Sequence, residues 1–416
     1  MIAAQDSETP SLAPLRVLCL DIEGGHGGSS RSLFESVRHT DPGTARVEVW
    51  CRRDGPVQER YAALGVPCRV TPDMPKVSAL PRLSRNLIVH AGFVRDFVRA
   101  SGFRSELARE VAARFDVVHF NHEALWLLAR WLRSRTAKPL TMHIRTNLWD
   151  TPFARRQVRT IAHCVDHVVF ISENERATHR RLGAPGRGTV IHNIATLPDT
   201  EPEPHPAIPD DGRFKIASLS NTSWLRGTDR LVHVAAALAA RGRRDVLFVV
   251  AGDVALGRSM PGALGSLARR GGTLKDYAMA EGVGDMVLFL GHAREPERVL
   301  AACDALAKPT RENNPWGRDI IEAMAMGKPV FSVGIDATFV ETGETGVLQP
   351  AFDADDLADR IIALAGDREA CRKLGDRGRE RVARLCNGPR RAADLVAVWR
   401  QAVAERREKQ AEAAGS

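Results

Sequence analysis

Long apolar runs are missing from this 416-residue sequence. A helix needs about 20 mostly apolar residues to cross a bilayer, and the more apolar runs here, such as 246–251, are only long enough for a strand. A basic stretch followed by an apolar one is also missing from the start of the chain, where Asp6 and Glu8 occur instead. We therefore expect neither a membrane-spanning helix nor a secretory signal, and we interpret residues 1–14 as a polar tail.

Cysteine is scarce and scattered. The seven cysteines are odd in number, and no two of them form a Cys-x-x-Cys pair. This pattern disfavours both a disulfide scaffold and a cysteine zinc site. The pairs His119/His122 and His163/His167 have spacings that metal ligands use, but no third ligand accompanies them, so we expect no metal. A reducing cytoplasm is the simplest compartment for such a chain.

Positive charge is in excess, with 59 Lys and Arg against 51 Asp and Glu, a net charge of +8. Most of the excess lies between Lys76 and Arg114, where apolar residues recur at near-helical spacing. Such a basic amphipathic helix can lie on an anionic membrane surface, and a packed helix with a solvated face is the equal alternative. Because no aromatic-basic RNA motif accompanies the charge, we expect no nucleic-acid partner.

Short apolar runs alternate with helical patterns along most of the chain, which predicts mostly parallel sheets covered on both faces. Five prolines interrupt this rhythm between Pro198 and Pro209, and it restarts at Phe214. We therefore predict an N-terminal domain over 15–197, a linker over 198–212, a second domain over 213–388, and a final helix over 389–416 that crosses back to the first domain. Ligands of such sheets bind outside the carboxyl ends of the strands, which predicts a site in a cleft between the two domains.

The most specific segment runs from Lys308 to Val330, KPTRENNPWGRDIIEAMAMGKPV. It resembles the donor-binding signature of the retaining family 4 glycosyltransferases (glycosyl transferases group 1), which have the GT-B fold. That signature has an acid, a Gly-aromatic-Gly turn and then Glu-Ala-Met-Ala-x-Gly-x-Pro-Val. The resemblance implies two Rossmann-like parallel-sheet domains facing a cleft, with Glu322 accepting hydrogen bonds from the nucleotide ribose. A surface helix that carries a solvated glutamate is the structural alternative.

The segment departs from the family pattern at the sugar contact. The family has a glutamate eight positions before the ribose glutamate, and this chain has Asn314 there, with Glu312 two residues earlier. Pro315 replaces the first glycine of the turn and removes one backbone donor. The resemblance implies that Asn314 or Glu312 contacts the sugar. Further implied substrate contacts come from Trp316, Gly317 and Arg318, which precede a helix predicted over 320–326.

Two further loops resemble the family. Where the family has an arginine and a lysine five residues apart, this chain has Asn221 and Arg226, and Thr228 is a plausible cap for the next helix. A cation beside a helix N-terminus stabilises a diphosphate leaving group, so the resemblance assigns Arg226 to the diphosphate. The double glycine Gly27-Gly28 resembles the first-strand loop of the family, although a tight structural turn would look the same.

For the acceptor, the resemblance implies one contact residue, His143. It ends a predicted strand at the position where the family has a histidine lining the acceptor side of the cleft. Together these resemblances imply a retaining transferase that uses a nucleotide-diphospho-sugar as co-substrate and needs neither cofactor nor metal. They imply a glycan, lipid-linked or small-molecule acceptor in bacterial surface glycan or glycolipid assembly, in the cytoplasm or at the inner face of the membrane. A sugar-nucleotide epimerase or hydrolase of the same fold, and a non-catalytic anion- or glycan-binding protein, are the alternatives.

Overall fold

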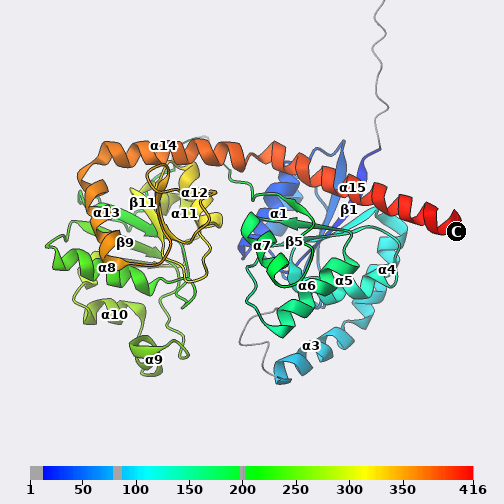
Figure 1. The fold of residues 1–416 in the computed structure, drawn as a ribbon, viewed down its shortest axis with the longest axis horizontal. Coiled ribbons are helices and arrows are strands. Elements are labelled where there is room, and N and C mark those ends of the chain that lie inside the picture. Colours follow the sequence, from blue (N-terminus) through cyan, green and yellow to red (C-terminus); the bar gives the residue numbers. More distant parts are fainter. Residues whose placement is uncertain (1–12, 78–86, 197–199, 201, 416) are drawn as a thin grey trace, which may run out of the picture. The chain divides into compact units, whose positions relative to one another are not determined.

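Two compact units make up the chain in the computed structural model (Figure 1). The structure describes residues 13–77, 87–196, 200 and 202–415. One unit combines 1–194 with 388–416, and the other comprises 195–387. Each contains a single sheet in which every strand pairing is parallel. The predicted α/β class with two parallel-sheet domains is confirmed.

The first unit has a seven-stranded sheet in the order β3-β2-β1-β4-β5-β6-β7. Its strands are β1 (Leu15–Asp21), β2 (Ala45–Cys51), β3 (Cys68–Val70), β4 (Val117–Phe120), β5 (Leu140–Ile144), β6 (His167–Phe170) and β7 (Thr189–Val190). Its helices are α1 (Gly28–Arg38), α2 (Val57–Ala63), α3 (Leu87–Arg99), α4 (Ser101–Arg114), α5 (Trp126–Arg133), α6 (Pro152–Cys164), α7 (Glu173–Arg181) and α15 (Gly388–Gly415). The strand order reverses between β1 and β4, which is where such sheets bind ligands.

The second unit has a six-stranded sheet in the order β10-β9-β8-β11-β12-β13. Its strands are β8 (Phe214–Ser218), β9 (Val246–Ala251), β10 (Val287–Gly291), β11 (Ala305–Lys308), β12 (Val330–Val333) and β13 (Gly346–Gln349). Its helices are α8 (Asp229–Ala240), α9 (Gly262–Arg269), α10 (Leu274–Ala280), α11 (Pro296–Ala301), α12 (Arg318–Ala325), α13 (Ala354–Gly366) and α14 (Arg368–Leu385). Here the order reverses between β8 and β11.

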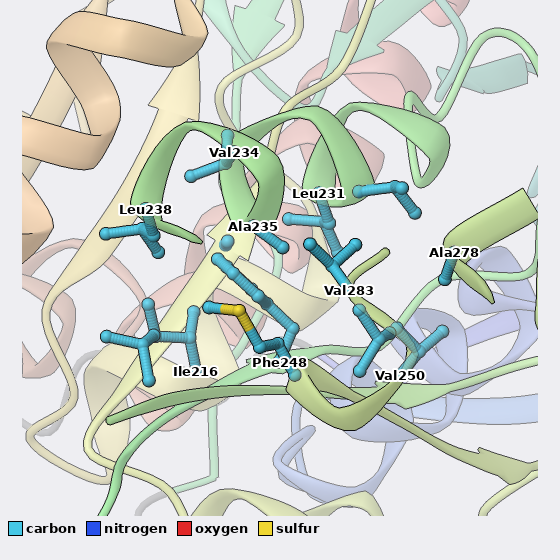
Figure 2. Close-up of a cluster of buried hydrophobic side chains, with 14 of the residues drawn as sticks. Ile216, Leu231, Val234, Ala235, Leu238, Phe248, Val250, Ala278 and Val283 are labelled. Carbon is cyan, nitrogen blue, oxygen red and sulfur yellow. The ribbon is translucent and has the colours of Figure 1, made fainter. Parts of the chain in front are cut away.

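The central strands are buried on both faces, which is why they are continuous apolar runs rather than alternating ones. All six residues of β9 are buried, and so are all five of β8. Figure 2 shows how α8 covers one face: Leu231, Ala235 and Leu238 project from one side of the helix towards the strand residue Phe248. Their spacing of three or four residues places them on one stripe of the helix. This packing holds α8, which follows the loop after β8, in a fixed position on the sheet.

The C-terminal helix α15 belongs to the first unit, although it is last in sequence. Leu395 and Trp399 are buried in the same cluster as Leu33 and Val37 of α1, and Figure 1 shows α15 in red beside α1 and β1. The predicted final helix over 389–416 therefore packs on the N-terminal sheet. The described part of the predicted linker lies along the second unit, where the His205 N–H donates to the Arg298 carbonyl at 2.9 Å.

The basic segment between Lys76 and Arg114 forms α3 and α4, with residues 78–86 outside the described part of the chain. On α3, Val94 and Val98 are 63% and 61% exposed. None of the helices in the described ranges has both the length and the apolar character that crossing a bilayer requires.

Candidate active site

Two loops leave the second sheet side by side at the point where its strand order reverses. Residues 219–228 follow β8 and residues 309–317 follow β11, and the two strands are neighbours in the sheet. Parallel strands present their carboxyl ends at one edge, so both loops emerge there. These loops carry the residues that the sequence assigns to the diphosphate and to the sugar.

Arg311 fastens the two loops together. Its guanidinium donates two hydrogen bonds to the Asp229 carboxylate, at 2.8 and 2.7 Å, and a third to the Trp224 carbonyl at 2.8 Å. It also stacks on the Trp224 ring, 3.5 Å from the ring centroid. The Asp229 side chain is only 3% exposed. A bidentate pair of this kind fixes direction as well as distance, so it locks the 219–228 loop against the 309–317 loop.

The same two loops also meet through backbone contacts. The Arg230 guanidinium donates to the carbonyls of Pro309 and Thr310 at 3.1 and 2.8 Å. Gly227 has φ +71°, and a Cβ there would lie 2.0 Å from the Pro309 oxygen. Only glycine fits this approach, because any side chain would collide with backbone. The Arg226-Gly227 pair in the sequence therefore has a structural reason for its glycine.

A buried lysine shapes the turn before α12. The Lys308 ammonium donates to the Trp316 carbonyl at 2.7 Å and to the Asp319 carboxylate at 3.0 Å, and the residue is 3% exposed. Burial lowers the pKa of Lys308, and the Asp319 charge opposes that shift. Gly317 has φ +139°, and a Cβ there would lie 2.7 Å from the ammonium nitrogen. The lysine thus holds the N-terminus of α12 and its free N–H groups at the sheet edge.

Arg226 lies exposed on the first loop, with its backbone N–H donating to the Ser223 hydroxyl at 3.2 Å. Its guanidinium forms no ion pair with any residue that the structure describes. The side-chain carbonyl of Asn221 accepts from the Asp253 N–H at 3.1 Å, which braces this loop against the one after β9. Thr228 occupies the N-cap position of α8, but its side chain makes no capping hydrogen bond, contrary to the cap suggested by the sequence.

Glu322 is held within its own helix. Two nitrogens of the Arg318 guanidinium donate to the Glu322 Oε1 at 3.0 and 2.8 Å, an i,i+4 pair in which both side chains are mostly buried. The helix begins at Arg318, two residues before the predicted start at 320. The predicted ribose contact and Arg318 are therefore brought together on one face of α12.

The residues predicted to contact the sugar lie in the 309–317 loop. The Oδ1 of Asn314 is buried and has no hydrogen-bond partner among the described residues. The Glu312 N–H donates to the Thr310 hydroxyl at 3.1 Å. Trp316 is buried, so it contributes to the turn through its carbonyl and to the interior through its ring. An unsatisfied buried acceptor is costly, and a ligand hydroxyl would satisfy the Asn314 oxygen.

The loop tip is strained and anchored to β12. Asn313 has φ +47°, which is uncommon for a residue other than glycine. Its side-chain carbonyl accepts from the Ile335 N–H at 2.9 Å. Gly334 lies so close that a Cβ there would be 2.6 Å from Pro315. The proline that replaces the family glycine thus packs against the glycine that directly follows β12.

In the first unit, a buried carboxylate anchors the glycine loop. Asp21 ends β1 and is 1% exposed, and it accepts hydrogen bonds from the Ser30 hydroxyl and from the Asn121 amide at 2.8 Å. Burial raises the pKa of Asp21 in spite of these hydrogen bonds. Gly27 is the N-cap of α1 and Gly28 its first residue. Asp21 therefore fixes the first turn of α1 to the edge of the sheet.

Arg145 follows β5 and joins three segments at this edge. Its guanidinium donates to the Asn121 side chain at 2.6 Å and to Asn193 at 3.0 Å, and its N–H donates to the Glu123 carboxylate at 2.9 Å. Sequence reasoning missed this network. The available signal was that Asp21, Asn121 and Arg145 each stand at the end of a predicted strand or within two residues after it.

His143 lies inside β5 rather than at its end, and only 3% of the residue is exposed. Its Nδ1 shares a hydrogen bond with the Nε2 of His119 at 2.8 Å, and the other nitrogen of His119 bonds the Thr141 hydroxyl at 2.8 Å. The His119 ring meets Trp399 of α15 edge-on. Burial lowers the pKa of His119 to about 3 and that of His143 well below its usual value, so both rings are neutral. His143 is thus part of a buried pair, and its acceptor role stays a prediction.

Two family descriptions together match most of this chain. The description "Glycosyl transferases group 1" matches residues 200–381, and "Glycosyl transferase 4-like domain" matches 27–194. The first of these ranges contains every loop of the second unit described above, including the Glu322 helix. The chain belongs to the glycosyl transferases group 1 family.

Curated relatives of this chain include a D-inositol 3-phosphate glycosyltransferase of Nocardia farcinica, 35% identical over 168 residues. That match covers 38% of this chain and 34% of the relative, so the chain spans about a third of that protein's length. An alpha-D-kanosaminyltransferase of Streptomyces kanamyceticus is 25% identical over 76% of this chain and 90% of its own.

Among solved structures, the Anabaena protein HepE in complex with UDP has a TM-score of 0.72 at 18% identity, over 93% of this chain and 100% of its own. This likeness establishes the GT-B fold.

Proposed function

We propose that the chain is a retaining glycosyltransferase that moves a sugar from a nucleotide-diphospho-sugar to an acceptor in bacterial surface glycan or glycolipid assembly. The observation that carries this proposal is the exposed Arg226 guanidinium, which has no ion-pair partner among the described residues. It lies on the loop that the Arg311–Asp229 pair holds at the edge of the second sheet. An exposed arginine on a loop that is itself held in place, with no ion-pair partner among the described residues, suits an anionic ligand. The names of the relatives, which are transferases, and the UDP in the HepE structure support the same reading of the site.

In this proposal Arg226 and the N-terminus of α12 neutralise the diphosphate, so no metal ion and no cofactor is needed. The Glu322 carboxylate can accept from the two ribose hydroxyls, because each of its oxygens has two lone pairs and Arg318 fixes the carboxylate in one orientation. Asn314, whose buried Oδ1 has no partner in the described chain, accepts from a sugar hydroxyl, with Glu312 as the neighbouring acid.

We propose retention by front-face attack rather than through a covalent intermediate. The leaving diphosphate oxygen accepts the proton of the acceptor hydroxyl on the face from which it departs, and the acceptor oxygen forms its bond to the anomeric carbon on that same face. This route needs a well-stabilised diphosphate and no nucleophilic side chain, which agrees with an arginine as the central group. Gly27 and Gly28 would allow substrate to approach the backbone of the first unit closely.

We further propose that α3 lies on an anionic membrane surface when the acceptor is lipid-linked. Ala91, Val94 and Val98 are exposed at helical spacing, and Arg95 and Arg99 flank them. Apolar residues flanked by arginines bind interfaces by burying the former and pairing the latter with lipid phosphates. Substitution of Val94 and Val98 by aspartate should abolish sedimentation with phosphatidylglycerol vesicles. Unchanged sedimentation would make α3 an ordinary solvated helix.

A thermal-shift screen with UDP-, GDP-, ADP- and TDP-sugars tests the main proposal. A nucleotide sugar at about 100 times its dissociation constant stabilises the folded chain by about 2.7 kcal/mol. We expect one nucleotide to raise the melting temperature of the wild type and to lose most of that effect in the Arg226→Ala variant. An epimerase or hydrolase would also bind the donor, but it would convert it fully without acceptor. A non-catalytic anion-binding protein would respond to none of the four.

A further inference from the structure

Three cationic side chains gather at the carboxyl edge of the first sheet, outside the groups used above. Arg52 and Arg53 follow β2, and Lys76 belongs to the segment that follows β3. The strands β1, β2 and β3 are neighbours, so these residues lie beside the glycine loop that follows β1. A Cβ on Gly24 would lie 2.5 Å from the Arg53 carbonyl, which shows how closely that loop packs on the arginine segment.

Hydrogen bonds fix Arg52 and the backbone segment that carries Lys76. The Arg52 N–H donates to the Asp21 carbonyl, and its Nε donates to the Met74 carbonyl, both at 2.9 Å. The Val77 N–H donates to the Ala124 carbonyl at 2.7 Å. The 71–77 segment is therefore held across the ends of several strands, and Lys76 is held with it.

These charges are not balanced within the described part of the chain. None of Arg52, Arg53 and Lys76 forms an ion pair with a residue that the structure describes. Burial lowers the pKa of Lys76, and the charges of Arg52 and Arg53 lower it further. Burial and Arg53 likewise lower the pKa of Arg52. Gathering like charges in partly desolvated positions costs free energy unless an anion joins them.

Three carboxylates act on this cluster without forming an ion pair with it. Asp21 and Glu23 act on Lys76, and Asp96 acts on Arg52. The Asp21 carboxylate is already occupied by Ser30 and Asn121, and Asp96 is paired with Arg95. None of these carboxylates forms an ion pair with Arg52, Arg53 or Lys76. The three cations therefore remain available to an anion, and a phosphate monoester carries about two negative charges near neutral pH.

We propose that Arg52, Arg53 and Lys76 bind the phosphate group of a phosphorylated acceptor. The proposal rests on the function proposed above, since it names the class of acceptor for that transferase. The phosphate can belong to a water-soluble sugar or polyol phosphate or to a lipid headgroup. In both cases the group is a phosphate monoester beside the glycine loop, and the neutral parent alcohol lacks it.

The test compares a double variant with a matched control. Arg53→Gln with Lys76→Gln removes two charges from the cluster and spares Arg52, whose Nε braces the Met74 carbonyl. Arg46→Gln with Arg109→Gln removes two exposed charges elsewhere in the same unit. Calorimetric titrations with glycerol 3-phosphate and with glycerol are run with UDP at saturation, so that phosphate cannot occupy a nucleotide site. Circular dichroism melting confirms that both variants fold.

We expect the wild type and the control to bind glycerol 3-phosphate and not glycerol. The cluster variant should bind glycerol 3-phosphate about tenfold more weakly, because it loses charge-assisted hydrogen bonds to the phosphate. Vesicles of phosphatidylcholine with phosphatidic acid form the lipid arm. Sedimentation that is lost only in the cluster variant assigns the phosphate to a lipid, and sedimentation that is unchanged while glycerol 3-phosphate binding is lost assigns it to a soluble acceptor.

Two outcomes overturn the proposal: equal binding of glycerol 3-phosphate and glycerol by the wild type, or equal binding of the phosphate by the wild type and the cluster variant. UDP titrations of the same proteins distinguish a failure of the phosphate-site proposal from a failure of the proposed donor function. If UDP binds and phosphate discrimination is absent, only the acceptor site fails. If phosphate discrimination is present and no nucleotide binds, the donor function fails and the phosphate site stands.

Discussion

The buried pair between Arg311 and Asp229 gives the sharpest stability prediction. The substitution Asp229→Ala leaves the Arg311 guanidinium without its carboxylate, in a position where the arginine side chain is 14% exposed. Removing one partner of a buried pair costs about 3 to 5 kcal/mol, because the remaining charge stays desolvated. Since a small part of this guanidinium can still reach water, we take the lower value, about 3 kcal/mol.

For a unit of this size, each kcal/mol lowers the melting temperature by about 2 to 4 °C, so the second unit should melt about 6 to 12 °C lower. Scanning calorimetry measures this shift. The matched control is Asp359→Ala, which breaks an exposed pair with Arg241 and should cost at most about 1 kcal/mol. Amide exchange should also speed up over 219–228, since Arg311 holds that loop. A shift no larger than that of the control, with unchanged exchange, would refute the idea that the pair locks the two loops.

Three further predictions concern single groups. Arg226→Ala should leave the melting temperature unchanged, because the side chain is exposed and forms no ion pair with the described residues. It should lower the transfer rate by about 100-fold in a coupled nucleotide-release assay. The control is Arg258→Ala, which changes another exposed arginine of the second unit. Asn314→Ala should change the free energy of unfolding by no more than about 0.5 kcal/mol. It should reduce turnover and leave the affinity for UDP unchanged. A loss of UDP affinity in calorimetry would contradict the sugar contact. His119, with a pKa of about 3, and His143 stay neutral in the folded chain while their unfolded forms take up protons around and below pH 6.5. Stability should therefore fall as pH drops from about 6.5 to 5, with a slope that starts near half of its limit and approaches about 1.4 kcal/mol per pH unit for each ring. Calorimetric melting against pH measures this slope, which His119→Gln should reduce; an unchanged slope would mean that the histidines do not cause it.

Much of the architecture could be predicted from the sequence because parallel strands that are buried on both faces are short continuous apolar runs. The strands that begin at Phe214 and Val246 are of this kind, and the structure has them there. The helix boundaries were less accurate. The helix of the donor signature begins at Arg318 because Gly317 with φ +139° is its N-cap, and sequence reasoning placed the start at 320.

The contacts that position the candidate site could not be predicted, since they join residues far apart in the sequence. Arg311 and Asp229 are 82 residues apart, and neither has a feature that names the other as its partner. Lys308 and Asp319 are nearer, but only the turn at Gly317 brings them together. The sequence identifies cations that suit a diphosphate. Only the folded structure shows that Arg311 is paired with Asp229 while Arg226 has no ion-pair partner among the described residues.

The acceptor side shows the opposite difficulty. His143 was chosen because a polar residue at a strand end suits a site, but β5 continues one residue further and the ring bonds His119 in the interior. Arg145, one residue beyond the strand, takes the position at the edge. An error of one or two residues in a strand end therefore exchanges a buried side chain for an edge side chain, because residues inside the strand are covered by the sheet and its helices while the residue after the strand lies at the edge where ligands bind.

The central claim is sugar transfer with retention, and product analysis tests it most directly. The wild type is incubated with the labelled nucleotide sugar selected by thermal shift, with and without a bacterial cell extract as the source of acceptor, and the products are followed by NMR. The account predicts nucleoside diphosphate and an equal amount of labelled sugar on a new acceptor, in the anomeric configuration of the donor, with little release when the extract is left out. Free labelled sugar or an epimerised donor formed at the same rate without extract, or an inverted anomeric centre in the product, would contradict it.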